Sequence, residues 1–188
     1  MKKAFKEALE DSPIITAIKD DDGLKKCITC DSQVVFVLYG NIISISDIVA
    51  TIKEAGKIAM VHIDLISGLS SNEFAVDFLK KYTKADGIIT TKPALIRRAK
   101  DLGFYTILRL FLLDSMAYEH IEHQVHTAKP DVIEVLPAPM PKIVAKVCKL
   151  SSIPVIAGGL VSDKEEILTL LQAGVTSIST TNPDVWSM

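Results

Sequence analysis

Short apolar runs rich in β-branched residues recur eight times along this chain of 188 residues. Most are hydrophobic without interruption, which is typical of parallel strands that are buried on both faces. The runs are Ile14–Ile18, Val34–Tyr39, Ile58–Asp64, Gly87–Thr90, Tyr105–Leu110, Val132–Leu136, Val155–Ala157 and Ser177–Thr180. Amphipathic segments lie between them, and this repeated alternation of strand and helix predicts a closed parallel barrel.

Signals for helix ends support the same alternation. A serine followed three residues later by an acid is typical of a capping box at a helix start. The candidates are Ser44-x-x-Asp47, Ser70-x-x-Glu73 and Ser162-x-x-Glu165. Gly56, Gly103 and Gly174 fall where helices are expected to end, because glycine readily adopts the left-handed conformation needed there.

The order of the glycines separates the barrel from its main alternative, an open doubly wound sheet. Such a sheet usually carries its glycine fingerprint after the first strand, whereas Gly158-Gly159 comes late. The first unit is weak, with a turn at Lys19–Gly23 and a short helix that carries Cys27 and Cys30. We therefore predict a small (β/α)8 barrel of the TIM type, with a shortened first unit, as one domain over residues 1–188.

The composition indicates which cellular compartment and which kinds of binding partner to expect. Hydrophobic residues make up 48% of the chain, enough for a sizeable core, but no apolar run approaches the ~20 residues of a membrane span. The charged start does not predict a secretory signal, and three cysteines favour a reducing cytoplasm. The net charge of −2 gives no indication of nucleic acid. Cys27-x-x-Cys30 has no second pair, so structural thiols are favoured over a zinc or redox site, and we expect no metal or cofactor.

Two late segments predict a phosphate site. The run Pro154–Leu160 ends its apolar part at Gly158 and Gly159, and the hydroxyl-rich run Ser179–Asn182 precedes Pro183. Asn-Pro is typical of a helix start, and the free amides and dipole of a helix start favour an anion. Barrels often bind phosphate with the loops after strands 7 and 8. The predicted cradle comprises Gly158, Gly159, Ser179, Thr180, Thr181 and Asn182.

Charged residues occur where apolar strands end. They are His62, Asp64, Lys92, Arg109 and Glu134. A charge facing the covering helices would be unsolvated, so these side chains are expected inside the barrel near its carboxyl end. They either form a buried ionic layer or line a ligand pocket, and the nearby cradle favours the pocket.

Within such a pocket, each charged side chain has a predicted role. Lys92 and Arg109 are assigned to ligand anions, while Asp64 and Glu134 bind hydroxyls or orient the cations. Arg109 and Glu134 lie on neighbouring strands and are expected to pair. His62 is either a hydrogen-bonded core residue or a ligand contact.

Basic residues form two helical patches, which are usually solubilising but are also the places where an RNA backbone could bind. One comprises Lys142, Lys146 and Lys149, after the sixth strand. The other comprises Arg97, Arg98 and Lys100, after the fourth. His120, His123 and His126 recur every third residue and drift around a helix, so a solvated face is favoured over a metal cluster.

Several longer motifs, in a fixed order, are highly characteristic together. They are His62–Leu69, Asp86–Lys92, Arg109–Ser115, Lys129–Pro137, Ala157–Leu160 and Ser177–Thr181 with Trp186. From about Pro13 to the C-terminus the chain resembles the glycerol uptake operon antiterminators, the glycerol-3-phosphate-responsive antiterminators of bacteria. The resemblance implies a small (β/α)8 barrel that binds leader mRNA when glycerol 3-phosphate is present, prevents early termination and stabilises transcripts of glycerol-utilisation genes.

The leading hypothesis is thus a ligand-gated RNA-binding regulator and not an enzyme, with glycerol 3-phosphate as effector; a homodimer remains open. The alternative is a lyase- or isomerase-type enzyme acting on a small phosphorylated substrate, with Asp64, Lys92 and Glu134 as acid, base or electrophile. A barrel that has lost its ligand role is the least favoured.

Overall fold

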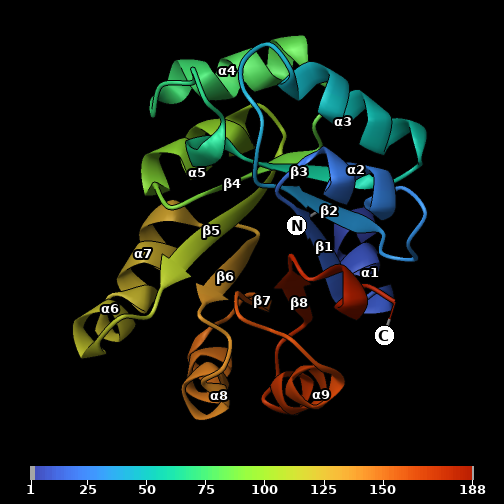
Figure 1. The fold of residues 1–188 in the computed structure, drawn as a ribbon. Coiled ribbons are helices and arrows are strands. Elements are labelled where there is room, and N and C mark those ends of the chain that lie inside the picture. Colours follow the sequence, from blue (N-terminus) through green and yellow to red (C-terminus); the bar gives the residue numbers. More distant parts are fainter. Residues whose placement is uncertain (1–2, 188) are drawn as a thin grey trace.

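A computed structural model describes residues 3–187 as a closed barrel of parallel strands in sequence order (Figure 1). The strands are β1 (Ile14–Ile18), β2 (Val34–Val37), β3 (Ile58–His62), β4 (Gly87–Thr90), β5 (Tyr105–Phe111), β6 (Val132–Leu136), β7 (Val155–Gly158) and β8 (Ser177–Thr180). Closure is made by β1 and β8, which pair in parallel with Ile14 opposite Ile178. The predicted (β/α)8 barrel is confirmed.

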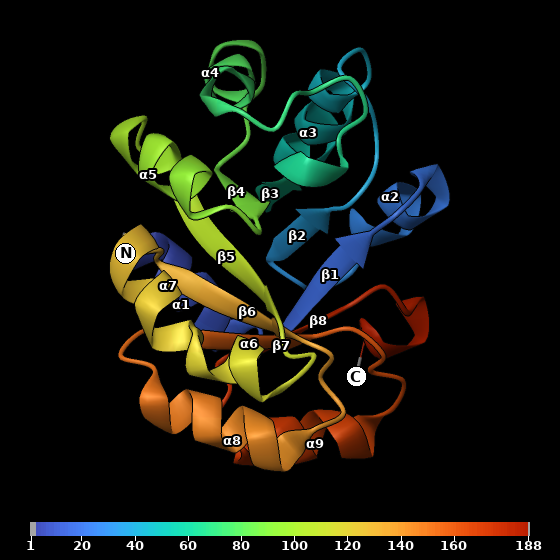
Figure 2. The same ribbon diagram turned by 90° about the vertical axis from the view of Figure 1, so that its left-hand side faces the viewer.

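Helices surround the strands, as the view in Figure 2 shows. They are α1 (Lys3–Asp11), α2 (Asp21–Cys27), α3 (Ile45–Glu54), α4 (Glu73–Tyr82), α5 (Pro93–Asp101), α6 (Ser115–Glu119), α7 (Ile121–Ala128), α8 (Pro141–Leu150) and α9 (Lys164–Gln172), with 3-10 turns η1 (Ile63–Leu65) and η2 (Pro183–Val185). Helix α2 has seven residues, in agreement with a shortened first unit. In residues 3–187, none of the helices has the length and apolarity to cross a membrane.

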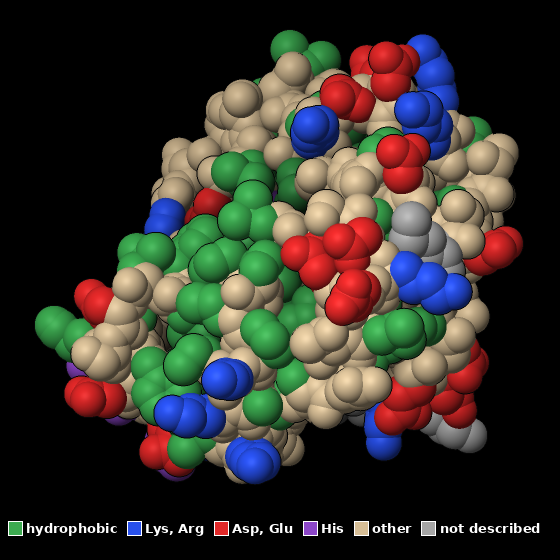
Figure 3. Space-filling model, turned by 60° about the horizontal axis from the view of Figure 1, so that its bottom comes forward, with side chains coloured by type: hydrophobic (Ala, Val, Ile, Leu, Met, Phe, Trp, Pro, Cys, Tyr) green, Lys and Arg blue, Asp and Glu red, His purple; other side chains and the backbone are tan. Residues whose placement is uncertain are grey.

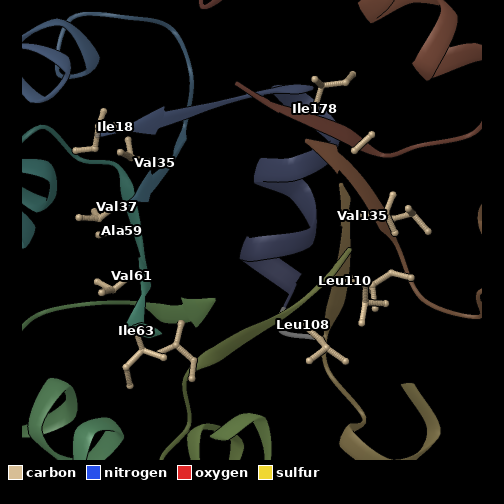
Figure 4. Close-up of a cluster of buried hydrophobic side chains, with 14 of the residues drawn as sticks. Ile18, Val35, Val37, Ala59, Val61, Ile63, Leu108, Leu110, Val135 and Ile178 are labelled. Atoms are coloured by element: carbon tan, nitrogen blue, oxygen red, sulfur yellow. The ribbon is translucent and has the colours of Figure 1, made fainter. Parts of the chain in front are cut away.

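The apolar core has two layers, because successive residues of a strand face opposite sides. Residues such as Val35, Leu108 and Val135 point outward against the helices (Figure 4). Their neighbours, among them Phe36 and Ile107, fill the barrel interior. This double burial explains the uninterrupted hydrophobic strands of the sequence.

Helix α1, which was not among the predicted elements, closes the amino-terminal end of the barrel. Phe5 and Leu9 are fully buried among the interior residues. The Phe5 ring stacks on Tyr105 with 4.5 Å between ring centroids. The Ser177 hydroxyl donates to the carbonyl of Leu9. This end is filled mostly by apolar side chains, and the charged residues Arg109 and Glu134 lie farther along β5 and β6.

Some predicted boundaries were wrong. The third strand ends at His62, and Asp64 lies in η1 instead of on the strand. Asn72 and Asp163, not the serines, cap α4 and α9 through their side chains. Asparagine and aspartate cap helices as well as serine does, so adjacent candidates compete. Ser44 is at the start of α3 but makes no side-chain capping bond.

Candidate ligand site at the barrel mouth

A buried ion pair lies inside the barrel above the apolar layer. Arg109 of β5 and Glu134 of β6 are register partners. The Arg109 Nε donates to Glu134 Oε2 at 2.6 Å, and the Glu134 side chain is fully buried. The other carboxylate oxygen accepts from the Ser179 hydroxyl at 2.5 Å. The predicted pairing is confirmed, and both oxygens of Glu134 have a donor, as a buried carboxylate requires.

Gly158 makes room for this arrangement at the end of β7. A Cβ added there would collide with Ser179 Oγ and would lie 2.8 Å from Glu134 Oε1. Gly158 therefore serves close packing around the ion pair. Gly158 is also part of the predicted phosphate cradle, and no pattern in the sequence indicates this packing constraint.

A second polar group lies across the mouth, on the β3 and β4 side. Asp64 Oδ2 accepts from the Thr90 hydroxyl at 2.8 Å and from the amide of Thr91 at 3.0 Å. The ammonium of Lys92 lies 3.5 Å from Asp64 Oδ1, and 42% of the Lys92 side chain is exposed. The η1 turn thus brings Asp64 to the end of β4, although it is not on a strand.

His62 is buried between these two groups. Its Nδ1 lies 3.8 Å from Asp64 Oδ2, and only 4% of its side chain is exposed. Burial and the nearby Arg109 guanidinium lower the pKa of His62 to about 4, against the opposing effect of Asp64. The imidazole is therefore neutral near pH 7.

Two buried polar atoms at the mouth have no hydrogen-bond partner in residues 3–187. They are His62 Nδ1 and Asp64 Oδ1. Buried polar atoms are nearly always satisfied by protein, water or ligand, because an unmade bond is costly. Their proximity makes the β3–β4 side of the mouth the candidate place for ligand hydroxyls.

The hydroxyl-rich end of β8 is largely satisfied internally. The Thr180 hydroxyl donates to the Val161 carbonyl and accepts from the Asn182 amide. The Asn182 side chain accepts from the Asp184 amide and so caps η2. The Asn-Pro helix start is confirmed as this single 3-10 turn. Of the predicted cradle hydroxyls, that of Thr181 is exposed.

The loop after β7 has an unusual backbone beside this end. Gly159 has φ +76° and Leu160 has φ +61°. Leucine rarely adopts the left-handed region, so the turn is held by its surroundings. Binding of phosphate by these two loops remains a prediction.

Comparison with known proteins identifies the family. The sequence model described as "Glycerol-3-phosphate responsive antiterminator" matches residues 14–186. The chain belongs to this family. Because the family is described as an antiterminator, membership supports a regulatory role for this protein.

Its relatives agree with this assignment. A protein of Escherichia coli K12, "Uncharacterized protein YgcP", is 46% identical over 180 residues, which is 96% of this chain and 94% of that protein. The glycerol uptake operon antiterminator regulatory protein of Listeria monocytogenes is 32% identical, with a TM-score of 0.88 over 92% of this chain and 94% of that one. A glycerol uptake operon antiterminator-related protein of Thermotoga maritima is 38% identical, with a TM-score of 0.83 over 94% and 99% of the two chains.

More distant barrels share the fold alone. A deoxyribose phosphate aldolase from Aeropyrum pernix superposes with a TM-score of 0.72 at 14% identity over 96% of this chain and 90% of that one. At that identity the likeness shows a barrel and carries no information on chemistry.

The two basic patches of this antiterminator-family chain differ in how their charges are used. Arg98 binds Asp77 through Nε and Nη2, at 3.0 and 2.5 Å. Lys100 donates to the Lys129 carbonyl and lies 3.7 Å from Asp131. The remaining member, Arg97, is exposed. Two of the three cations in this patch thus have internal partners.

The α8 patch has a different character. Lys142, Lys146 and Lys149 are all exposed, and α8 carries no acidic residue. In residues 3–187, none of the three ammonium groups lies within ion-pair distance of a carboxylate. This patch is therefore more available to an external anion than the patch on α5.

The thiol of Cys27 and the ammonium of Lys57 both bind backbone carbonyls near the first helical unit. Cys27 is buried, its thiol donates to the Leu24 carbonyl, and burial and Cys30 raise its pKa to about 11. The buried Lys57 ammonium, which was not predicted from the sequence, donates to the carbonyls of Cys30 and Ser32.

Among the described residues, no group of three or more His, Cys, Asp or Glu could hold a metal ion, and this includes His120, His123 and His126.

Proposed function

We propose that this protein is an RNA-binding antiterminator that responds to glycerol 3-phosphate, binding leader mRNA of glycerol-utilisation genes and promoting readthrough and transcript stability. The observation that carries the ligand part is that two buried atoms among the described residues, His62 Nδ1 and Asp64 Oδ1, have no hydrogen bond and lie beside the cations Lys92 and Arg109. Family membership supports the effector and the regulatory role.

The mouth has the groups that glycerol 3-phosphate needs. A ligand hydroxyl would donate to Asp64 Oδ1, and a second would bond to the neutral His62. Lys92 is exposed enough to move from Asp64 toward a phosphate. The sequence-predicted role of the Gly159 and Thr181 loops in holding that phosphate is part of this proposal. Arg109, fixed by Glu134, adds positive potential without rearrangement.

Glycerol 3-phosphate is expected to raise the melting temperature, whereas glycerol is not, because glycerol lacks the charged group that Lys92 and Arg109 attract. At about 100 times its dissociation constant, a ligand that binds only the folded state adds roughly 2.7 kcal/mol to the free energy of unfolding. Scanning calorimetry measures the shift, and Asp64→Asn should weaken it. Equal shifts from glycerol and its phosphate would contradict the proposal.

Leader RNA is expected to bind more tightly in the presence of glycerol 3-phosphate, and the ligand to bind more tightly in the presence of RNA by the same factor, since the coupling is reciprocal. Calorimetry at low salt measures both affinities, with an RNA of scrambled sequence as control. The integrated phosphorus signal of the ester should stay constant, because a regulator binds the ligand without converting it. Loss of the ester, or no RNA binding by ligand-saturated protein, would favour the enzyme alternative.

A further inference from the structure

A groove of about 370 Å³ lies between the loop after β5, helix α6 and helix α8. Its lining side chains are mostly apolar, and Lys146 stands at its edge. The lining residues are Leu112, Leu113, Asp114, Ser115, Tyr118, Met140, Ile143 and Lys146. The carboxylate of Asp114 is occupied in capping α6, where it accepts from the Ala117 amide.

The surface around the groove is unusually apolar for a protein exterior. Leu113 is 81% exposed, and Phe111 and Met116 are each about half exposed. Leu160, in its left-handed conformation, is also exposed at the end of β7. Figure 3 shows a broad apolar area on this face, with Lys and Arg side chains along its lower edge. A contiguous apolar patch of this kind marks an interaction surface.

Charge indicates what the surface contacts. Lys142 and Lys149 flank Lys146 on the exposed side of α8, and α8 contributes no acid to oppose them. The groove thus offers an apolar floor whose lining includes the aromatic ring of Tyr118, beside a row of exposed cations. Single-stranded nucleic acid has the complementary form, with stacking bases on one side and phosphates on the other.

We propose that this groove, defined by its eight lining residues, binds an unpaired segment of RNA, with bases on the apolar floor and phosphates along Lys142, Lys146 and Lys149. This inference rests on the proposed function and names the surface and the form of RNA involved. A duplex is disfavoured as occupant because its bases are stacked inside and cannot reach an apolar floor. A second copy is disfavoured because a two-fold contact centred on the groove would bring the same lysine row to both sides.

The groove and the ligand site are connected along the chain, because β5 and β6 carry the ion pair and the segments that follow them line the groove. Phe111 is the register partner of Leu136, two residues beyond the Arg109–Glu134 pair on the same strands. Phe111 and Arg109 therefore face the same side of the sheet. The chain after Leu136 leads through Met140, which lines the groove, directly into α8. Ligand and RNA would thus contact opposite ends of the same two strand–loop segments.

Two variants of the groove separate its two contributions. The triple variant Lys142→Gln/Lys146→Gln/Lys149→Gln should weaken binding of ligand-saturated protein to leader RNA and reduce the salt slope by about 0.7 per lost phosphate contact, the value for a single strand. Tyr118→Leu keeps an apolar side chain and removes the ring, so it should weaken binding about 10-fold with the salt slope unchanged. Both variants should bind glycerol 3-phosphate as the unmodified protein does.

The control variant Lys19→Gln/Lys25→Gln/Lys26→Gln makes the same change of charge at exposed residues near the first helical unit, and it should bind RNA like the unmodified protein. If the groove variants bind RNA as tightly as this control, the groove proposal fails while the antiterminator function stands. If the unmodified protein binds no leader RNA with ligand present, the proposed function fails as well. If the chain is a dimer by sedimentation and Leu113→Ser/Met116→Ser makes it a monomer, the groove is a contact between copies and the proposal is overturned.

Discussion

Glu134→Ala is expected to lower the free energy of unfolding by about 3–5 kcal/mol, because it leaves the Arg109 guanidinium buried without its counter-charge. The carboxylate is fully buried and accepts from both Arg109 Nε and Ser179 Oγ. The alanine also leaves a cavity next to Gly158. Urea unfolding at pH 7, followed by circular dichroism, measures the loss.

Two further variants separate charge from volume. Glu134→Gln keeps the volume and one acceptor oxygen but removes the charge, so it should cost nearly as much as the alanine if the unpaired cation dominates. The double variant Arg109→Met/Glu134→Leu removes both charges and should be more stable than Glu134→Ala, since replacing a buried pair by apolar groups is often neutral. A loss below about 1 kcal/mol for Glu134→Ala would instead indicate a solvated carboxylate.

The barrel could be predicted from the sequence because its signal is repeated. Most strands, such as Val34–Val37, are apolar on both faces, and the helices around the barrel cover their outer side. The charged residues Arg109 and Glu134 could be recognised as site candidates because a charge in a buried strand is costly unless it is paired or solvated. Their pairing followed from adjacent strands in equal register.

The features that could not be predicted are of two kinds. Some depend on contacts between residues that are distant in the sequence, and others on which of two neighbouring residues caps a helix. Helix α1 closes the barrel through Phe5 and Leu9, whose partners include residues as distant in the sequence as Tyr105 and Ser177. The role of Gly158 is set by Ser179 and Glu134, which no local pattern connects to it. The predicted N-cap of α4 was Ser70 and the observed one is Asn72, because both residue types cap helices and they lie two residues apart.

The pH dependence of stability should carry a large contribution from His62. Its pKa is lowered from 6.5 to about 4, first by burial and then by Arg109, while Asp64 acts in the opposite direction. Between these two values the unfolded chain binds a proton that the folded chain does not, so the free energy of unfolding falls as the pH falls from about 6.5 to about 4. The stabilisation is fully present above pH 6.5, and about 3 kcal/mol of it should be lost by pH 4, at about 1.36 kcal/mol per pKa unit.

Carboxylates titrate in the same range, so the contribution of His62 is isolated by a variant that lacks the ionisable ring. His62→Asn keeps a polar atom near Nδ1, and the difference in unfolding free energy between the unmodified protein and this variant should shrink as the pH falls toward 4. Proton NMR of the imidazole offers an independent measurement, with a midpoint expected near 4. A midpoint near 6.5, or a difference that does not change with pH, would show that His62 is hydrated at the mouth. In that case His62 Nδ1 would have a water partner. Only Asp64 Oδ1 would then remain, among the described residues, as a buried atom without a hydrogen bond that could bind a ligand hydroxyl.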